Sequence, residues 1–140
     1  MYEILIVGGG PAGLTAAIYA ARAGKHVAVL ERGSTGGQII SAPLVENYPG
    51  IPSVSGTELA RQMTEQACTF GAEIVYTEAV GLEKTPAGFR VLCTDGVREA
   101  KAVILATGAA HRSLGLAAED ALTGCGVSYC ACLLYTSPSP

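Results

Sequence analysis

The chain has 140 residues, which is room for about one domain. A hydrophobic fraction of 49% against 15% charged residues excludes a disordered segment and predicts a large buried core. The net charge of −3 offers no basic surface to nucleic acid or to a membrane, and the apolar run near the N-terminus is too short for a signal peptide or a membrane span, so we expect a cytoplasmic protein.

The first thirty residues predict a strand, a helix and a second strand. The β-branched run "YEILIV" ends at "GGGPAG", which is typical of a buried strand that meets a tight turn. An Ala-rich helix then begins at Pro11 and ends at Gly24, and "HVAVLE" forms the next buried strand. Elements of these lengths predict a right-handed βαβ unit with parallel strands.

The stretch from Arg32 to Ser55 is rich in Gly, Pro and Ser and predicts a long connection, which inside a compact domain is usually functional. Ser55 and Glu58 have the spacing of a capping box at the start of a second helix. The apolar face of that helix is predicted to consist of Leu59, Met63, Ala67 and Phe70.

After Gly71 the sequence predicts strands. "AEIVYT" leads to "AVGLEKT", and "GFRVLCT" is followed by "VREA" across Asp95-Gly96, a strong hairpin signal. "KAVILATG" is predicted to be a further, buried strand. These elements indicate an α/β fold, a Rossmann-like three-layer domain with a parallel sheet, helices and a small antiparallel β-meander on one face.

Gly8, Gly10 and Gly13 fit the pattern G-x-G-x-x-G between the first strand and the first helix. In this pattern the first glycine permits the turn, the second lets backbone approach a pyrophosphate, and the third lets helix and strand pack closely. Glu31 closes the second strand 23 residues after Gly8, near the spacing of a ribose-binding carboxylate. Since a carboxylate would repel a 2′-phosphate, this site is predicted to bind FAD or NAD, not NADP.

The five cysteines have neither the spacing of a secreted disulfide framework nor that of a zinc site, and we expect no bound metal. Three of them are interpreted as ordinary core or surface residues. Cys130 and Cys132 differ, because they form a C-x-C pair just before the low-complexity ending "LLYTSPSP".

Three further motifs, "GGQI", "VENYPG" and "ILATG", stand in order along the chain, and "GVSYCA" follows them. Together with the glycine turn they resemble the FAD domain of bacterial low-molecular-weight thioredoxin reductases, flavoproteins with two dinucleotide-binding domains. The resemblance extends from Met1 to about Ala131. It implies FAD as cofactor, NADPH as electron donor at a site outside this sequence, thioredoxin as protein partner, and a homodimer.

The resemblance also implies roles for individual residues. The segment from Gly8 to Gly13 and Glu31 would bind the ADP half of FAD, while residues 37 and 38 would lie against its ribityl and flavin part. Asn47 would bond near the isoalloxazine, and the chain would pass the cofactor at residues 107 and 108. The complete expected cofactor set is Gly8, Gly10, Pro11, Ala12, Gly13, Glu31, Arg32, Gly37, Gln38, Asn47, Thr107 and Gly108.

Cys130 matches the first cysteine of the family's redox CxxC, but Cys132 stands one residue short of the second. On a helix one residue corresponds to a rotation of about 100°. One reading frame of a common sequencing adapter translates as the ending of this chain, so we interpret residues 132–140 as a non-native tail. The expected organisation is the first part of the FAD domain in 1–114, a crossover toward the NADPH and redox-cysteine domain in 115–131, and that tail. A chain truncated in this way is expected to be inactive.

Two alternatives stay open. The chain could belong to a related flavoprotein, either ferredoxin-linked or of the alkyl hydroperoxide reductase type. It could also be a non-catalytic module that binds FAD or NAD.

Overall fold

The computed structural model describes residues 1–123 and 125–129, which fall into two compact units divided after Gly108. The first unit contains six strands, two α-helices and one 3-10 helix. In chain order these are β1 (Tyr2–Val7), α1 (Pro11–Arg22), β2 (Val27–Glu31), η1 (Gly37–Ser41), α2 (Gly56–Thr69), β3 (Glu73–Tyr76), β4 (Ala79–Thr85), β5 (Gly88–Cys93) and β6 (Gly96–Leu105). Within the described part of the chain, no helix is long and apolar enough to span a bilayer.

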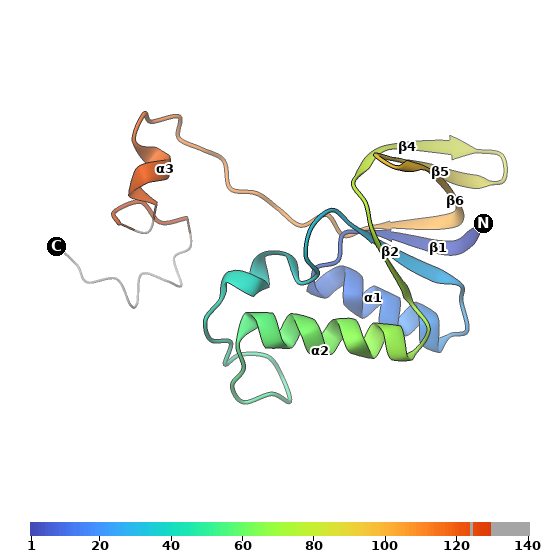
Figure 1. Cartoon of the computed structure of the whole chain (residues 1–140), viewed down its shortest axis with the longest axis horizontal. Coiled ribbons are helices and arrows are strands. Elements are labelled where there is room, and N and C mark those ends of the chain that lie inside the picture. The colour runs from blue at the N-terminus through green and yellow to red at the C-terminus, as the bar shows by residue number, and fades with distance from the viewer. Residues whose placement is uncertain (124, 130–140) are drawn as a thin grey trace. The chain divides into compact units, whose positions relative to one another are not determined.

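The strands form one sheet in the order β3-β2-β1-β6-β5-β4. β1 pairs in parallel with both β2 and β6, and β2 pairs in parallel with β3, so the expected βαβ unit is confirmed. β4, β5 and β6 form the antiparallel meander. In Figure 1 the helices α1 and α2 lie on one side of the parallel strands and the β4–β5 hairpin lies on the other.

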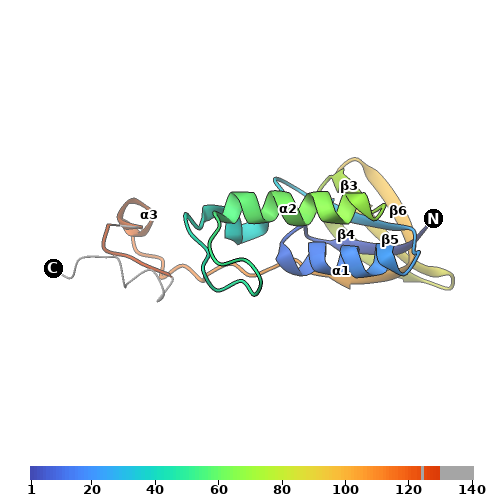
Figure 2. The same ribbon diagram turned by 90° about the horizontal axis from the view of Figure 1, so that it is seen from below.

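Alternate residues of the central strands supply the two faces of this three-layer core. Val27 and Val29 of β2 pack with α1 and with Ala67 of α2, whereas Ala28 and Leu30 pack with the meander. A third cluster joins the two helices, which lie side by side in Figure 2, to the connection between them; its buried members are Leu14, Val45, Leu59 and Met63. The expected fold class, with its three layers, is therefore confirmed.

β6 differs from the expectation of two separate strands. Because no turn residue lies between "VREA" and "KAVIL", the strand continues through Ala100, which pairs with Phe89 of β5 and with Tyr2 of β1. Its last part was expected to be buried, but Ile104 and Leu105 are exposed. Among the described residues only β1 pairs with that part of β6, which accounts for the exposure.

Helix α2 begins and ends with two departures from the expected pattern. The Ser55 hydroxyl accepts a hydrogen bond from the Glu58 amide, as expected, but the Glu58 carboxylate bonds to Arg61 and Gln62 instead of turning back. Phe70 lies just past the helix and is exposed, with the Arg22 guanidinium 5.6 Å from its ring centre. The other three members of the predicted apolar face are buried.

The second unit, described for residues 109–123 and 125–129, contains only the short helix α3 (Glu119–Leu122). Its centre is the carboxylate of Glu119, whose residue is 3% exposed. That carboxylate accepts hydrogen bonds from the Ser113 hydroxyl, from the amides of Leu114 and Leu116, and from the Tyr129 hydroxyl. The ring of His111 stacks on Tyr129 at a centroid distance of 3.6 Å.

Candidate dinucleotide-binding site

The glycine turn joins the end of β1 to the start of α1, and two of its glycines are required by close packing. A Cβ on Gly8 would lie 2.2 Å from the Ala106 carbonyl oxygen, and Gly8 also has a φ of +106°. A Cβ on Gly13 would lie 1.9 Å from the Gly8 carbonyl oxygen. The turn, the first helix and the end of β6 therefore fit together only with hydrogen at these two positions.

Gly10 is different, because nothing in this structure requires it. It has an ordinary φ of −74°, and an added Cβ would meet no atom within 4 Å. Gly10 is the N-cap of α1, and no side chain caps the helix there. The first amides of a helix point outward and carry partial positive charge, which suits an anion. The space above Gly10 is thus open to a phosphate group.

The side chain of Glu31 is oriented by backbone amides on both of its oxygens. The amide of Gly9 donates to Oε2 at 2.7 Å, and the amide of Gly33 donates to Oε1 at 2.9 Å. Each carboxylate oxygen can accept more than one hydrogen bond. The half-buried carboxylate therefore stays available to two neighbouring hydroxyl groups while its direction is fixed.

The connection after β2 lies against the glycine turn. The Gly36 amide donates to the Gly9 carbonyl oxygen at 2.7 Å, and a Cβ on Gly37 would lie 3.4 Å from the Cα of Gly10. Gly36 and Gly37 both have positive φ, at +112° and +56°, conformations that favour glycine. The motif "GGQI" is thereby placed beside the glycine turn.

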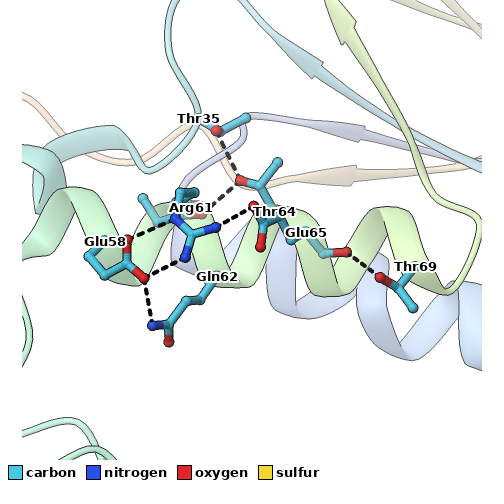
Figure 3. A network of polar contacts seen from close by, with 8 residues as sticks. Thr35, Glu58, Arg61, Gln62, Thr64, Glu65 and Thr69 are labelled. Carbon is cyan, nitrogen blue, oxygen red and sulfur yellow. Dashed lines mark hydrogen bonds and ion pairs between the residues drawn. The ribbon is translucent and has the colours of Figure 1, made fainter.

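Helix α2 supports this connection from behind. A Cβ on Gly36 would lie 2.5 Å from the Cβ of Ala60, so the loop and the helix touch at this point. The hydroxyl oxygens of Thr35 and Thr64 lie 2.9 Å apart (Figure 3). The connection is therefore held between the glycine turn and α2.

The expected site residues fall into two groups. The structure brings together the glycine turn with Pro11 and Ala12 at the start of α1, Glu31, Gly37 and the end of β6, since a Cβ on Gly8 would lie 3.2 Å from the Cα of Thr107. Gly108 follows Thr107 directly and closes the first unit.

Three further expected cofactor residues are Arg32, Gln38 and Asn47. Arg32 is exposed and its guanidinium lies 3.7 Å from the carboxylate of Glu78. Gln38 is in η1, where its carbonyl accepts from the Ser41 hydroxyl, and Asn47 is exposed in the connection between η1 and α2. Cys130 and Cys132 lie outside the described residues, as does the 132–140 tail. The roles assigned to all of these residues remain predictions.

Sequence reasoning missed the groups that orient the expected ones. Gly9 and Gly33 hold the Glu31 carboxylate through their backbone amides, which no side-chain pattern reveals. Thr35 and Thr64, which contact each other, are 29 positions apart in the sequence. The run "RGSTGG" after Glu31 was the available signal for the first of these, because consecutive small residues let a chain fold back onto a carboxylate.

The parallel sheet, the glycine turn and the oriented carboxylate at the end of β2 define a dinucleotide-binding α/β domain. A family model described as "Pyridine nucleotide-disulphide oxidoreductase" matches residues 2–132. The chain belongs to this family of oxidoreductases.

Its relatives are thioredoxin reductases. The chain is 44% identical to that of Listeria monocytogenes over 94% of its length, and 45% identical to that of Treponema pallidum over 93%. It spans only 41% and 43% of those two relatives. The crystal structure of the Streptococcus pyogenes thioredoxin reductase matches with 47% identity and a TM-score of 0.83, covering 94% of this chain and 43% of that one. The resemblance found in the sequence motifs is confirmed.

Proposed function

We propose that the chain binds FAD, with the ADP half on the glycine turn and the ribose hydroxyls on Glu31. The observation that carries this proposal is the Glu31 carboxylate, held by the amides of Gly9 and Gly33 at the end of β2. A carboxylate in this place accepts hydrogen bonds from free ribose hydroxyls and repels a 2′-phosphate. This chemistry favours FAD or NAD over NADP, and the relatedness to thioredoxin reductases favours FAD.

The residues present fit such a cofactor. Gly8 and Gly13 close the turn tightly, while the space over Gly10 stays open next to the uncapped start of α1. The phosphates would be held by the amides of the turn, and the ribose by Glu31. When bound, FAD would supply electron transfer between a nicotinamide donor and a cysteine pair.

For the whole protein we propose an NADPH-dependent thioredoxin-disulfide reductase that acts in the cytoplasm as a homodimer. Cys130 is proposed as the first redox cysteine, the group that attacks the disulfide of thioredoxin. Support comes from the relatives, which are named thioredoxin reductases and are more than twice as long as the matched region. A second cysteine of a CxxC pair and the NADPH site would lie in sequence beyond Ala131.

Replacement of Gly10 tests the cofactor site directly. Gly10→Ala adds a methyl group that meets no protein atom within 4 Å, so the thermal unfolding midpoint should stay unchanged. The same methyl group enters the space proposed for the pyrophosphate, and we expect FAD affinity to fall roughly tenfold or more. FAD fluorescence titration measures it. A variant that unfolds normally and binds FAD as tightly as the unmodified chain would contradict the proposed site.

A charge-matched pair of variants tests the role of Glu31. Glu31→Gln removes the carboxylate from the site, and Glu83→Gln removes one from the meander, where Glu83 pairs with Arg90 at 3.6 Å. We expect only the first to weaken FAD binding and to reduce the preference for FAD over NADP. Equal effects of the two variants would show that overall charge, and not the ribose contact, sets the affinity.

The proposal for the whole protein is tested by resequencing the source DNA across the codons for Gly126 to Pro140. We expect Ala131 to be followed by one residue, a cysteine and Asp-Gly, and later by a second glycine-rich βαβ unit. The recovered protein should then reduce thioredoxin with NADPH. Activity with ferredoxin or a peroxide-reducing partner instead would identify one of the related flavoproteins, and absence of the cysteine pair would favour a non-catalytic module.

A further inference from the structure

The orientation of Glu31 depends on a loop that is anchored at two points. One end of the segment 33–36 is tied to the glycine turn, because the Gly36 amide donates to the Gly9 carbonyl oxygen. The second anchor is the hydroxyl of Thr35, which is half-buried and lies 2.9 Å from the hydroxyl of Thr64 on α2. Thr35 is two residues from Gly33, whose amide holds Oε1 of Glu31.

The chemistry of Thr64 makes it suited to receive this loop. A threonine hydroxyl has one proton to donate and can also accept. The Thr64 hydroxyl lies 2.7 Å from the Ala60 carbonyl oxygen, four residues earlier in the helix. The same hydroxyl donates to the Thr35 hydroxyl, so its single proton is shared between the carbonyl of its own helix and the loop.

We propose that Thr64 is a positioning residue for the ADP half of FAD: through Thr35 it fixes the loop whose Gly33 amide orients the ribose-binding carboxylate of Glu31. This inference rests on the proposed FAD site and adds to it a residue on a different element. Thr64 itself is not proposed to touch the cofactor. Thr64 acts on Glu31 through its hydroxyl contact with Thr35, the loop residues 33–35 and the Gly33 amide.

Helix α2 provides a firm support for this contact. Leu59, Met63 and Ala67 are buried on its inner side, and Ser55 caps its start. Ala60 lies against Gly36, so the loop cannot slide toward the helix without a clash. The loop is thus held from behind by packing at Gly36 and by a hydrogen bond at Thr35, and only the second of these can be removed without changing side-chain volume.

Thr69 offers a matched control on the same helix. Its hydroxyl donates to the Glu65 carbonyl oxygen at 2.8 Å, the same bond that Thr64 makes with Ala60. Figure 3 shows Thr69 farther along α2, away from Thr35. A threonine-to-valine change at either position leaves the side-chain size nearly unchanged. It removes a hydroxyl that bonds to the carbonyl four residues earlier in the helix. Only the change at position 64 also removes the contact to the loop.

The experiment compares Thr64→Val, Thr64→Ser and Thr69→Val with the unmodified chain. FAD and ADP affinities are measured by calorimetry, the exchange rate of the Gly33 amide by NMR, and the unfolding midpoint by heating. We expect Thr64→Val to weaken binding of both ligands about three- to tenfold, the size of one lost hydrogen bond. Its Gly33 amide should exchange faster even without ligand. Thr64→Ser should restore both properties, and Thr69→Val should leave both unchanged.

Each other result counts against the inference. Unchanged ligand affinity in Thr64→Val overturns it, and so does an equal loss in Thr69→Val, which would mean that general weakening of the helix is the cause. Failure of Thr64→Ser to restore binding would exclude a role for the hydroxyl. If the unmodified chain binds neither FAD nor ADP, the proposed function itself is wrong, and the positioning role falls with it.

Discussion

The two units of this chain are ordered by different forces. In Met1–Gly108, strands and helices bury apolar side chains in three layers, with residues such as Leu5 and Leu14 fully buried. In the described residues 109–123 and 125–129, by contrast, Leu114 is 70% exposed and Leu116 and Leu122 are exposed as well. What is buried there is a charge, the carboxylate of Glu119, with four donors around it.

This difference predicts different responses to mutation. Apolar packing is spread over many small contacts, so the loss of one side chain weakens the whole cooperative unit without disordering a particular segment. Where one polar group accepts several hydrogen bonds, the conformation of the segment depends on that group. If it is lost, each donor must bond to water instead.

Truncation in the apolar core should destabilise the first unit strongly. Leu5 of β1 belongs to the buried cluster between the parallel strands and the meander, together with Leu30 and Val91. Leu5→Ala should lower the free energy of unfolding by about 2–5 kcal/mol, the range for a buried leucine. Urea denaturation measures it, and Leu82→Ala, at an exposed position on β4, serves as the control with a much smaller loss. Similar losses in the two variants would mean that this core is not packed as described.

Removal of the Glu119 charge should loosen the segment that bonds to it, around Ser113 to Leu116, without affecting the first unit. Glu119→Gln keeps the shape but places an amide against groups that all donate, so the Leu114 and Leu116 amides should exchange roughly tenfold faster or more. Hydrogen exchange followed by mass spectrometry measures this. Asp120→Asn, an equal charge change at the neighbouring position, is the control. Protection that survives Glu119→Gln would show that the segment is ordered by something other than this carboxylate.

Acid should have the same effect as this substitution. Hydrogen bonds to Glu119, above all from the Leu114 amide, hold the pKa of its carboxyl below the usual value of 4.5. A lowered folded-state pKa contributes stability that is complete above the unfolded pKa and is lost as pH falls through the folded one. Protection of the segment should therefore be constant above about pH 4.5 and fall at lower pH, whereas Glu119→Gln should show little dependence in this range.

Local spacing was sufficient to predict much of the fold and part of the site. The glycine turn, the βαβ unit, the Ser55 cap and the hairpin at Asp95-Gly96 each depend on residues a few positions apart, and the structure contains all four. Where the sequence failed, the deciding partner was elsewhere. Glu58 turned to Arg61 rather than to the cap, because a guanidinium one turn ahead is a stronger partner than a backbone amide.

The contact that holds the loop beside Glu31 could not be predicted from sequence patterns, for a related reason. The contact of Thr35 with Thr64 links a loop to a helix, and neither residue has a spacing that marks it. Likewise, the sequence predicted two strands where the structure has the single strand β6. The first part of β6 pairs with β5 of the meander and the second part pairs with β1, so the apolar pattern changes within one strand. Such features arise from packing between distant segments, and only the folded chain shows them.

The first unit also contains a polar cluster, centred on the half-exposed side chain of Asp95. The carboxylate of Asp95 accepts from the buried Thr77 hydroxyl at 2.5 Å and from both terminal nitrogens of Arg98, at 2.8 and 2.7 Å. It joins the connection after β3 to the β5–β6 hairpin. Because apolar layers also hold this region, Asp95→Asn should lower the unfolding midpoint without exposing the hairpin to exchange, a smaller effect than that of Glu119→Gln on its segment.

The pH dependence of this variant follows from the same linkage. The hydrogen bonds from Arg98, and then from Thr77, lower the pKa of Asp95 from its usual value of 3.8. The gap in midpoint between the unmodified chain and Asp95→Asn should therefore be complete above about pH 4 and close as the pH falls further. A gap that persists in strong acid would assign the loss to packing of the asparagine and not to the charge.

The smallest effect is expected for the ion pairs on the outer face of α2. Arg61 bonds to Glu58 and Glu65 (Figure 3), but these side chains are largely exposed, so water and salt compete with every pair. The hydrogen bond from Arg61 is the main cause of the lowered pKa of Glu58, and Arg61→Ala should let that pKa rise toward 4.5 in an NMR titration. The unfolding midpoint at neutral pH should hardly move, and any change should shrink in high salt. A large, salt-independent loss would mean that Arg61 contributes through packing, and that the contrast between a stable apolar interior and a dispensable charged surface does not hold for this helix.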